Sequence, residues 1–290
     1  MNDKTILITG ATRSMGKAAL LALAKLGHTI IFVGRNEAEA KKVKSAIVTE
    51  SGNSNIDYLL ADLMCIEDIY KLAAAYKAKY NHLDVLVQNA GGLFGKEREE
   101  SKDGIEKTIA LNLAAPYLLN ILLLDVLQKR NGARIVMTAS AGHSMMAKPD
   151  FNDIELKQGY SPNRAYGNAK LFLIMMARVL HQKLKEKGWN ITVNTLHPGI
   201  VINDKMEKDA KEKGFLGKNI LLPLMKLLMK TPEQGAATSI YLATSPEVEG
   251  RSGLYFSNCK PAKVNEKYIT EETKKIIWDY CGKITGTSFQ

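Results

Sequence analysis

The first two thirds of the chain alternate between short apolar runs and longer segments in which apolar residues recur at helical spacing. The apolar runs are rich in Ile, Val and Leu and predict strands at residues 5–9, 28–33, 56–60, 83–87, 134–138 and 190–195. Helices are predicted at residues 15–26, 36–49, 105–128 and 164–187, with another ending near residue 80. Because the apolar runs are continuous, the strands are expected to be covered on both faces. Strands joined by helices in this way predict an α/β fold with a doubly wound parallel sheet.

The pattern loosens after residue 195, where glycines and a proline surround an apolar run. A further helix is predicted at residues 232–243, opened by a proline. Since neither a repeat nor a linker is visible, the chain is expected to form one domain over residues 1–290, with a variable segment near 200–230. The Leu- and Met-rich stretch 215–229 leaves three interpretations open: a packed helix, a lid over a substrate site, or a contact with a membrane surface.

The chain is basic, with a net charge of +10. Such a charge can attract nucleic acid, anionic lipid or a polyphosphate ligand. The lysines are spread through predicted helices, as at residues 39–44, which is typical of solvated helix faces. No zinc-binding, recognition-helix or aromatic-plus-basic motif accompanies the charge, so nucleic acid is not expected as a partner.

The three cysteines, Cys65, Cys259 and Cys281, lack the spacing of metal ligands and are expected to be reduced thiols. No metal site is expected. The N-terminal residues run directly into an apolar strand, and no stretch of about 18 uncharged apolar residues follows. These features predict a cytoplasmic protein without a signal peptide or a membrane span. Peripheral membrane contact and a homo-oligomer stay open.

A glycine-containing turn, Thr-Gly-Ala-Thr-Arg-Ser-Met-Gly, joins the first predicted strand to the first helix. Glycine lets the backbone approach a phosphate closely, and the free N–H groups of a helix N-terminus stabilise its charge. At the first strand of an α/β chain, such a turn favours a Rossmann-type dinucleotide site over an ordinary tight turn. The candidate cofactor-binding residues of the turn are Gly10, Arg13, Ser14, Met15 and Gly16.

The end of the second strand indicates which dinucleotide is preferred. Sites for NAD place an acidic residue there to bind the ribose hydroxyls, whereas this chain has Val-Gly-Arg-Asn at residues 33–36. Arg35 and Arg13 offer planar guanidinium donors suited to a 2′-phosphate. NADP(H) is therefore the expected cofactor, while the nearby Glu37 keeps NAD(H) open as the alternative.

Six landmarks, in order along the chain, resemble those of the short-chain dehydrogenase/reductase superfamily, and the resemblance covers nearly the whole length. The landmarks are Gly10 with Gly16, Asp62-Leu63, Asn89-Ala90-Gly91, Asn112, Ser140 with Tyr166 and Lys170, and Pro198-Gly199. A closer similarity is to the retinol dehydrogenase-like branch, carried by residues 103–106, 134–136, 196–199 and 253–259 and by Trp278. Ser14 departs from the family pattern, in which a second glycine is usual.

The resemblance implies two sets of site residues. Those expected beside the dinucleotide are Asp62, Leu63, Asn89, Ala90, Gly91, Pro198, Gly199 and Val201. The catalytic tetrad of the family is matched by Asn112, Ser140, Tyr166 and Lys170, the last two of which also contact the cofactor.

Tyr166 and Lys170 lie four residues apart in a predicted helix, so they share one face. The pKa of free tyrosine is about 10, and a neighbouring ammonium with an oxidised nicotinamide is expected to lower it. Tyr166 could then exchange a proton with an alcohol or carbonyl near neutral pH. Ser140 is expected to donate a hydrogen bond to the same oxygen, and Asn112 to position a water molecule beside Lys170.

Together these features predict an NADP(H)-dependent oxidoreductase that interconverts a carbonyl and an alcohol, with Tyr166 as general acid and base. The side chains of residues 215–229 favour a lipophilic aldehyde, ketone or alcohol as substrate. The alternative is a non-catalytic NADP(H)-binding sensor on the same fold, although such proteins usually lose the Tyr or the Lys. His143 is expected on a loop surface, and His197 in a structural role.

Overall fold

The computed structural model describes residues 3–202, 206, 208, 211, 212, 214, 219 and 222–289, apart from the side chains of residues 224, 226 and 228. It contains one eight-stranded sheet in the order β3-β2-β1-β4-β5-β6-β7-β8. The strands are β1 (Thr5–Thr9), β2 (Thr29–Gly34), β3 (Ile56–Leu60), β4 (Val85–Gln88), β5 (Ala133–Thr138), β6 (Ile191–His197), β7 (Tyr255–Ser257) and β8 (Lys260–Pro261). Neighbouring strands from β3 to β7 pair in parallel, and β8 pairs antiparallel with β7.

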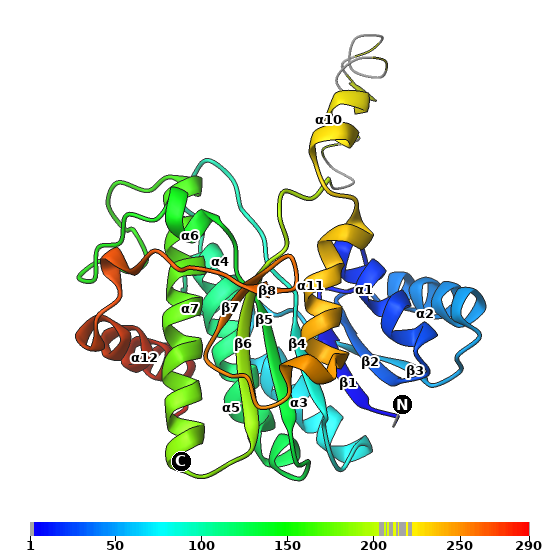
Figure 1. Ribbon diagram of the computed structural model, residues 1–290. Coiled ribbons are helices and arrows are strands. Elements are labelled where there is room, and N and C mark those ends of the chain that lie inside the picture. Colours follow the sequence, from blue (N-terminus) through cyan, green and yellow to red (C-terminus); the bar gives the residue numbers. More distant parts are fainter. Residues whose placement is uncertain are drawn as a thin grey trace.

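Helices cover both faces of this sheet (Figure 1). One face carries α1 (Ser14–Lys25), α2 (Glu37–Ser51) and α11 (Pro232–Thr244). The other carries α3 (Ile66–Lys79), α5 (Ala115–Gln128) and α7 (Pro162–Glu186), with α12 (Glu271–Thr285) packed beside α7. Shorter helices are α4 (Lys107–Ile109), the π-helical turn η1 (Ala110–Ala114), α6 (Gly142–Met145), α10 (Leu222–Leu228), η3 (Pro246–Val248) and η4 (Glu266–Tyr268).

Strand β1 shows how the sequence builds two cores from one sheet. All five of its residues are buried. Ile6 and Ile8 join the core beneath α1, α2 and α11, whereas Leu7 joins the core beneath α3, α5 and α7. Successive side chains of a strand point to opposite faces, so a continuous apolar run is needed when both faces are covered. The predicted doubly wound parallel sheet is confirmed.

The order of the strands reverses between β1 and β4. From β1 the chain crosses to β2 and then β3 on one side, and it returns to β4 on the other. Crossovers leaving in opposite directions open a crevice beyond the carboxyl ends of the two central strands, where open α/β sheets bind ligands. The residues that follow β1 and β4 are Gly10 and Asn89, both predicted to contact a dinucleotide.

Some elements differ from the sequence-based prediction. Six strands were expected, but β7 and β8 extend the sheet to eight. These two strands have three and two residues, too short for a recognisable apolar run. The helix expected at residues 105–128 is interrupted by the π-helical turn Ala110–Ala114. The C-terminal helix α12 was not predicted, although Trp278 within it had been noted.

Helix α10 stands away from the sheet, beyond the carboxyl ends of its strands (Figure 1). It belongs to neither large core: Ile202 and Leu222 form a separate small cluster against Met225 and Met229. Leu227 on the same helix is 81% exposed. These contacts do not match a helix packed into the main core. Much of the stretch 215–229 lies outside the described residues, so its role as a lid or membrane contact stays a prediction.

One described helical stretch, Lys107–Gln128, is long and apolar enough to cross a membrane by its composition. The prediction missed it because that prediction required an uninterrupted uncharged run. Of its most apolar window, 78% is buried inside the protein, as is usual for a core helix. This stretch is α4, η1 and α5, which pack against the sheet and α7.

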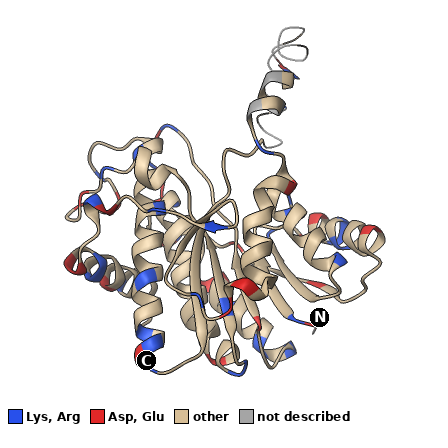
Figure 2. Cartoon of the chain, in the orientation of Figure 1, with Lys and Arg blue, Asp and Glu red and all other residues tan. Residues whose placement is uncertain are grey.

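Charges of both signs occur together on the surface helices α2 and α12 (Figure 2). Some form pairs one helical turn apart, such as Lys41 with Glu37 and Lys275 with Asp279. This agrees with the expectation that the lysines lie on solvated helix faces, where such pairs contribute a few tenths of a kcal/mol each.

Because the core beneath α5 is closely packed, Leu118→Ala should lower the free energy of unfolding by roughly 2–5 kcal/mol. Leu118 is fully buried. Leu26→Ala removes the same atoms at a position that is 37% exposed and should change stability by about 0.5 kcal/mol or less. Urea denaturation of both variants measures the difference. Equal losses in the two variants would contradict the packing described for α5.

Candidate active site

The turn after β1 is packed so tightly against the backbone after β4 that glycine is required. Gly10 has a φ of +64°, and a Cβ on it would lie 2.6 Å from Ala90 Cα. A Cβ on Gly16 would overlap the carbonyl oxygen of Gly10. The two glycines therefore serve close backbone approach, the role that a phosphate-binding turn demands.

Asn89 ties the same two segments together. Its Nδ2 donates to Gly10 O at 3.0 Å, and the next residue, Ala90, donates its N–H to Thr9 Oγ1 at 3.1 Å. Asn89 Oδ1 is buried and has no hydrogen-bond partner among the described residues. A buried acceptor without a partner costs free energy unless something else bonds to it. Asn89 is therefore suited to accept a bond from a ligand in this crevice.

Ser14 shows how the turn manages without the usual second glycine. Its φ is +44°, a left-handed conformation uncommon for residues other than glycine. Serine thus keeps the backbone path of the family's turn at some cost in strain. Helix α1 begins at Ser14, so its N-terminal N–H groups lie where the turn meets the crevice.

A cleft of about 310 Å³ opens at the switch point of the sheet. It is lined by Gly10, Thr12, Arg13, Val33, Gly34, Arg35, Glu39, Ala61, Asp62, Leu63, Met64, Ala90, Gly91, Gly92, Phe94 and Leu111. Seven predicted cofactor-binding residues are among them: Gly10, Arg13, Arg35, Asp62, Leu63, Ala90 and Gly91. Glu39 and Phe94 were not predicted. Because they follow the strands by several residues, no local motif marks them.

The two arginines expected at a 2′-phosphate both line this cleft, but their surroundings differ. Arg13 Nε pairs with Glu39 Oε1 at 2.8 Å. Arg35 is exposed and has no ion-pair partner among the described residues. Glu37, which had kept NAD(H) open, pairs with Lys41 and does not line the cleft. The acidic residue that lines the cleft on this side, next to the two arginines, is Glu39.

At the opposite wall, Asp62 is held by its own backbone turn. Asp62 Oδ1 accepts the N–H of Met64 at 3.0 Å, and the Asp62 carbonyl accepts the N–H of Cys65. This local bonding fixes the carboxylate beside Leu63 at the carboxyl end of β3. Asp62 thus lines the cleft, and its contact with the dinucleotide stays a prediction.

Lys170 lies behind the floor of the cleft. Its Nζ donates to Thr138 O at 2.8 Å, and the side chain is 2% exposed. A Cβ on Gly91, which lines the cleft, would lie 3.0 Å from that Nζ. Burial lowers the pKa of Lys170 to about 7, because a charged ammonium is poorly solvated there. Lys170 thus changes its charge near neutral pH.

Tyr166 stands one helical turn before Lys170, whose Nζ is 5.7 Å from the centre of the phenol ring. A Cβ on Gly142 would lie 3.3 Å from the Tyr166 ring and 3.4 Å from Ser140 Oγ, so both side chains flank this glycine. Burial raises the pKa of Tyr166, while the nearby Ser140 hydroxyl acts in the opposite direction. Burial therefore governs the pKa of Tyr166 in the protein alone, while the lowering expected from the Lys170 ammonium together with an oxidised nicotinamide stays a prediction.

Asn112 sits at 0% exposure in the π-helical turn Ala110–Ala114. Its Nδ2 donates to Gly92 O at 2.9 Å and to Thr108 O at 2.8 Å, and its Oδ1 accepts the N–H of Gly92 at 3.2 Å. Asn112 therefore fixes Gly92, and with it the loop that forms one wall of the cleft. A Cβ on Gly91 would lie 2.8 Å from Asn112 Oδ1, so this oxygen and Lys170 Nζ share one neighbour.

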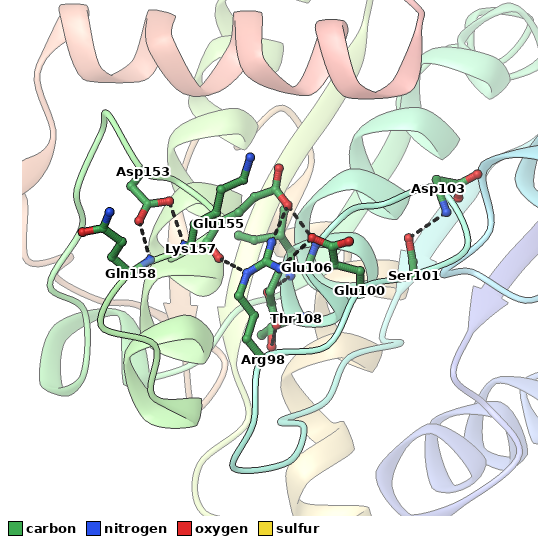
Figure 3. Close-up of polar contacts among 11 residues, drawn as sticks. Arg98, Glu100, Ser101, Asp103, Glu106, Thr108, Asp153, Glu155, Lys157 and Gln158 are labelled. Carbon is green, nitrogen blue, oxygen red and sulfur yellow. Dashed lines mark hydrogen bonds and ion pairs between the residues drawn. The ribbon is translucent and has the colours of Figure 1, made fainter.

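A buried carboxylate, not predicted from the sequence, fixes the helix that carries Asn112 (Figure 3). Glu106 accepts the N–H groups of Thr108 and Ile109 at 2.9 and 2.8 Å and caps the helix start. The Glu106 N–H donates to Glu155 Oε2, which also pairs with Arg98 Nη2 at 3.3 Å. An acidic residue just before a helix is the signal that could have identified this cap.

Two histidines, the buried His143 and the half-buried His197, hold the backbone around Ser140. His143 Nδ1 donates to Ser140 O at 2.6 Å, and its Nε2 accepts the N–H of Asn265 at 3.4 Å. The expectation of a surface role for His143 is wrong, since it is 4% exposed and packs against Tyr255. His197 Nδ1 accepts the N–H groups of Ala141 and Gly199 at 3.3 and 3.2 Å. Burial lowers the pKa of both rings, which favours the neutral forms that these bonds require.

The segment after β6 approaches the glycine turn from the other side. Gly199 has a φ of +95°, and Lys230 covers it while donating from Nζ to Pro198 O at 3.0 Å. A Cβ on Gly235 would lie 2.5 Å from Val201 Cγ2 and 3.2 Å from Met15 Sδ. The predicted residues Met15 and Val201 are thus brought close together at the start of α11.

Among the described residues, no group of three or more His, Cys, Asp and Glu side chains could hold a metal ion. Cys65, Cys259 and Cys281 are free thiols, and Cys65 and Cys281 are buried.

Residues 4–214 match the model of the short chain dehydrogenase family. The chain is 34% identical over 288 residues to human polyprenol dehydrogenase, covering 98% of this chain and 86% of that protein. It is 32% identical over 308 residues to human retinol dehydrogenase 14, covering 99% and 87%.

Solved structures share the same architecture. A short chain dehydrogenase from Shigella flexneri complexed with NADP is 25% identical, with a TM-score of 0.68 over 90% of this chain and 98% of that one. L-sorbose reductase from Gluconobacter frateurii, complexed with NADPH and L-sorbose, is 20% identical, with a TM-score of 0.71 over 88% and 95%. With the family model and the curated relatives, these likenesses show that the chain belongs to the short-chain dehydrogenase family of oxidoreductases acting on alcohol and carbonyl groups.

Proposed function

We propose that the chain interconverts a lipophilic alcohol and the corresponding carbonyl compound with NADP(H), using Tyr166 as general acid and base. The observation that carries the proposal is the placement of Lys170 Nζ directly behind Gly91, which lines the cleft at the switch point of the sheet. From there Lys170 also reaches the ring of Tyr166, with Ser140 beside it. Lys170 therefore connects Tyr166 to the wall of the cleft, although Ser140, Tyr166 and Lys170 are not among the residues that line it.

The residues present fit an NADP(H) molecule. The close-packed glycines leave the N-terminus of α1 open to a pyrophosphate, and Asn89 Oδ1 is a buried acceptor in need of a partner. Arg35, and Arg13 when released from Glu39, would hold the 2′-phosphate. When bound, the cofactor supplies or accepts a hydride at its nicotinamide ring. A related structure that is 25% identical is a complex with NADP, which supports this choice.

The proton side of the reaction belongs to Tyr166. In the carbonyl-to-alcohol direction, its hydroxyl would give a proton to the substrate oxygen, and Ser140 Oγ would donate a hydrogen bond to the same oxygen. Lys170, with a pKa of about 7, would be protonated as negative charge forms on the phenol, because opposite charges at this distance stabilise each other. The reverse direction uses the same groups in reverse.

A lipophilic substrate is supported by the mouth of the site. Three large apolar side chains, Leu93, Met145 and Ile200, are exposed on the segments that follow β4, β5 and β6. These strands are neighbours in the sheet, so the segments gather at one edge. Two relatives, polyprenol dehydrogenase and retinol dehydrogenase 14, are named for lipophilic alcohols.

Other aspects of the proposal rest on the sequence. A single domain over residues 1–290, a cytoplasmic location and the absence of nucleic acid as a partner stay predictions. Peripheral membrane contact and self-association stay open. The mechanism proposed above depends on none of them, since each of its residues lies within the described part of this chain.

Replacing Tyr166 by Phe should lower kcat by roughly 10²- to 10⁴-fold, because the proton donor and acceptor is lost. The Kd for NADPH should change little, since the ring remains. Steady-state kinetics on a panel of aldehydes, ketones and alcohols, with NADPH titration followed by fluorescence, measures both quantities. Tyr70→Phe serves as the control, because this tyrosine is partly exposed on α3. Tyr166→Phe with undiminished turnover would rule out the assigned role, and a wild type that binds NADPH without any turnover would favour the sensor.

The wild type should bind NADP⁺ more tightly than NAD⁺. Arg35→Ser should weaken NADP⁺ binding by roughly tenfold, because a charge-assisted bond to the 2′-phosphate is lost, and should leave NAD⁺ binding nearly unchanged. Isothermal titration of both dinucleotides measures this. Lys41→Ser, on the helix α2 that follows Arg35 but outside the cleft, should have no such effect. An equal loss for NAD⁺ and NADP⁺ would show that Arg35 does not read the phosphate.

His197 should act as a positioning residue for Ser140 and Gly199. His197→Ala removes the acceptor of two N–H groups and should lower kcat/KM roughly 10- to 100-fold, since small displacements of reacting groups are costly. His197→Asn, whose Oδ1 can replace Nδ1, should recover most of that activity. His181, which bonds Ser252 away from the site, supplies the matched pair of control variants. If the Ala and Asn variants at position 197 are equally impaired, the acceptor role is excluded.

A further inference from the structure

Glu39 occupies an unusual place for an acidic residue in a site that would bind an extra phosphate. It lies in the first turn of α2, where its N–H donates to Oδ1 of the cap residue Asn36 at 2.9 Å. Its side chain is 33% exposed and lines the same cleft as Arg13 and Arg35. The helix cap therefore fixes the backbone from which this carboxylate reaches into the cleft.

The Glu39 carboxylate already accepts a hydrogen bond from one of the donors of Arg13. Arg13 Nε donates to Glu39 Oε1 at 2.8 Å, which brings together the turn after β1 and the helix after β2. The Arg13 side chain is 71% exposed, so the pair faces solvent and is weak by itself. A doubly charged anion such as a phosphate can displace Glu39 from this weak ion pair. Breaking the pair still costs free energy, which lowers the affinity for that anion.

We propose that Glu39 tunes cofactor selectivity by competing with the 2′-phosphate of NADP(H) for Arg13. This inference rests on the proposed NADP(H) cofactor. A 2′-phosphate that bonds the Nε side of Arg13 has to displace the Glu39 carboxylate, and one that bonds the other guanidinium nitrogens lies near a carboxylate with the same sign of charge. NAD(H) lacks that phosphate, so its binding leaves the Arg13–Glu39 pair intact. Glu39 therefore weakens the binding of NADP(H) but not that of NAD(H). It reduces the preference for NADP(H) over NAD(H) that the two arginines create.

Arg35 and Arg13 then differ in how readily their side chains can bind a phosphate. Arg35 has no ion-pair partner among the described residues and is available to either a phosphate or solvent at all times. Arg13 offers its Nε only when Glu39 releases it. Because the pair is exposed, the penalty should shrink as salt screens it, with a Debye length of about 10 Å at 0.1 M.

The test compares Glu39→Gln with Glu37→Gln. Both residues lie in the first turn of α2 and both stabilise the helix dipole, but Glu37 pairs with Lys41 outside the cleft. Glu39→Gln should tighten NADPH binding about two- to fivefold at low salt and leave NADH binding within experimental error. Glu37→Gln should change neither. The Kd values are measured by fluorescence titration, with thermal unfolding to verify that all variants are folded.

A double variant tests whether Glu39 affects NADPH binding through Arg13. In an Arg13→Gln background, Glu39→Gln should bring no further gain in NADPH affinity, because there is no guanidinium left to release. A gain that persists in this background would overturn the competition for Arg13. An unchanged or weakened NADPH affinity in the single variant Glu39→Gln would overturn the proposal altogether.

These measurements are independent of turnover, so they separate the inference from the proposed function. If the wild type binds NADH but not NADPH, the proposed cofactor is wrong. A gain of NADPH binding in Glu39→Gln would support the inference even then. If NADPH binds and Glu39→Gln has no effect, the proposed function stands and the inference fails.

Discussion

The close contact between Gly10 and the backbone of Ala90 is the constraint on which the rest of the site depends. These residues follow β1 and β4, the two strands between which the sheet order reverses. Since no side chain fits between them, the two strand ends stay close and the crevice opens just above. Asn89 bonds across this contact, and Gly91, two residues on, leaves the space that Asn112 and Lys170 fill from behind. A binding crevice and an acid–base pair are thereby held in one fixed relation.

Burial sets the electrostatics of this arrangement. Lys170 is enclosed so completely that its pKa falls to about 7, and the phenol of Tyr166 is more reluctant to ionise than in water. Each group disfavours its own charge, while a charge on either one favours the opposite charge on the other. The neutral histidines 143 and 197 add no charge here and instead hold backbone groups. Burial therefore favours the neutral form of each of these four side chains.

Sequence reasoning predicted those features that a local pattern specifies. Continuous apolar runs gave the parallel strands, and Gly10, Gly16, Tyr166 and Lys170 were found because each belongs to a motif with fixed spacing. Features that depend on contacts between distant segments were missed. Glu39 meets Arg13 from another helix, and His143 bonds to the segment near Asn265. The rise in the pKa of Tyr166 in the protein alone was also missed, because it comes from burial, which no spacing reveals.

The π-helical turn Ala110–Ala114 lets the helical stretch Lys107–Gln128 contribute both to the wall of the cleft and to the hydrophobic core. One residue more per turn than in an α-helix shifts the angular phase of everything that follows by about 100°. The residues before the turn, capped by Glu106, therefore need not share a face with those after it, which bury Leu118 and Leu123 in the core. Asn112 sits where this phase change occurs, so the wall of the cleft and the hydrophobic interior can each be matched to their own neighbours.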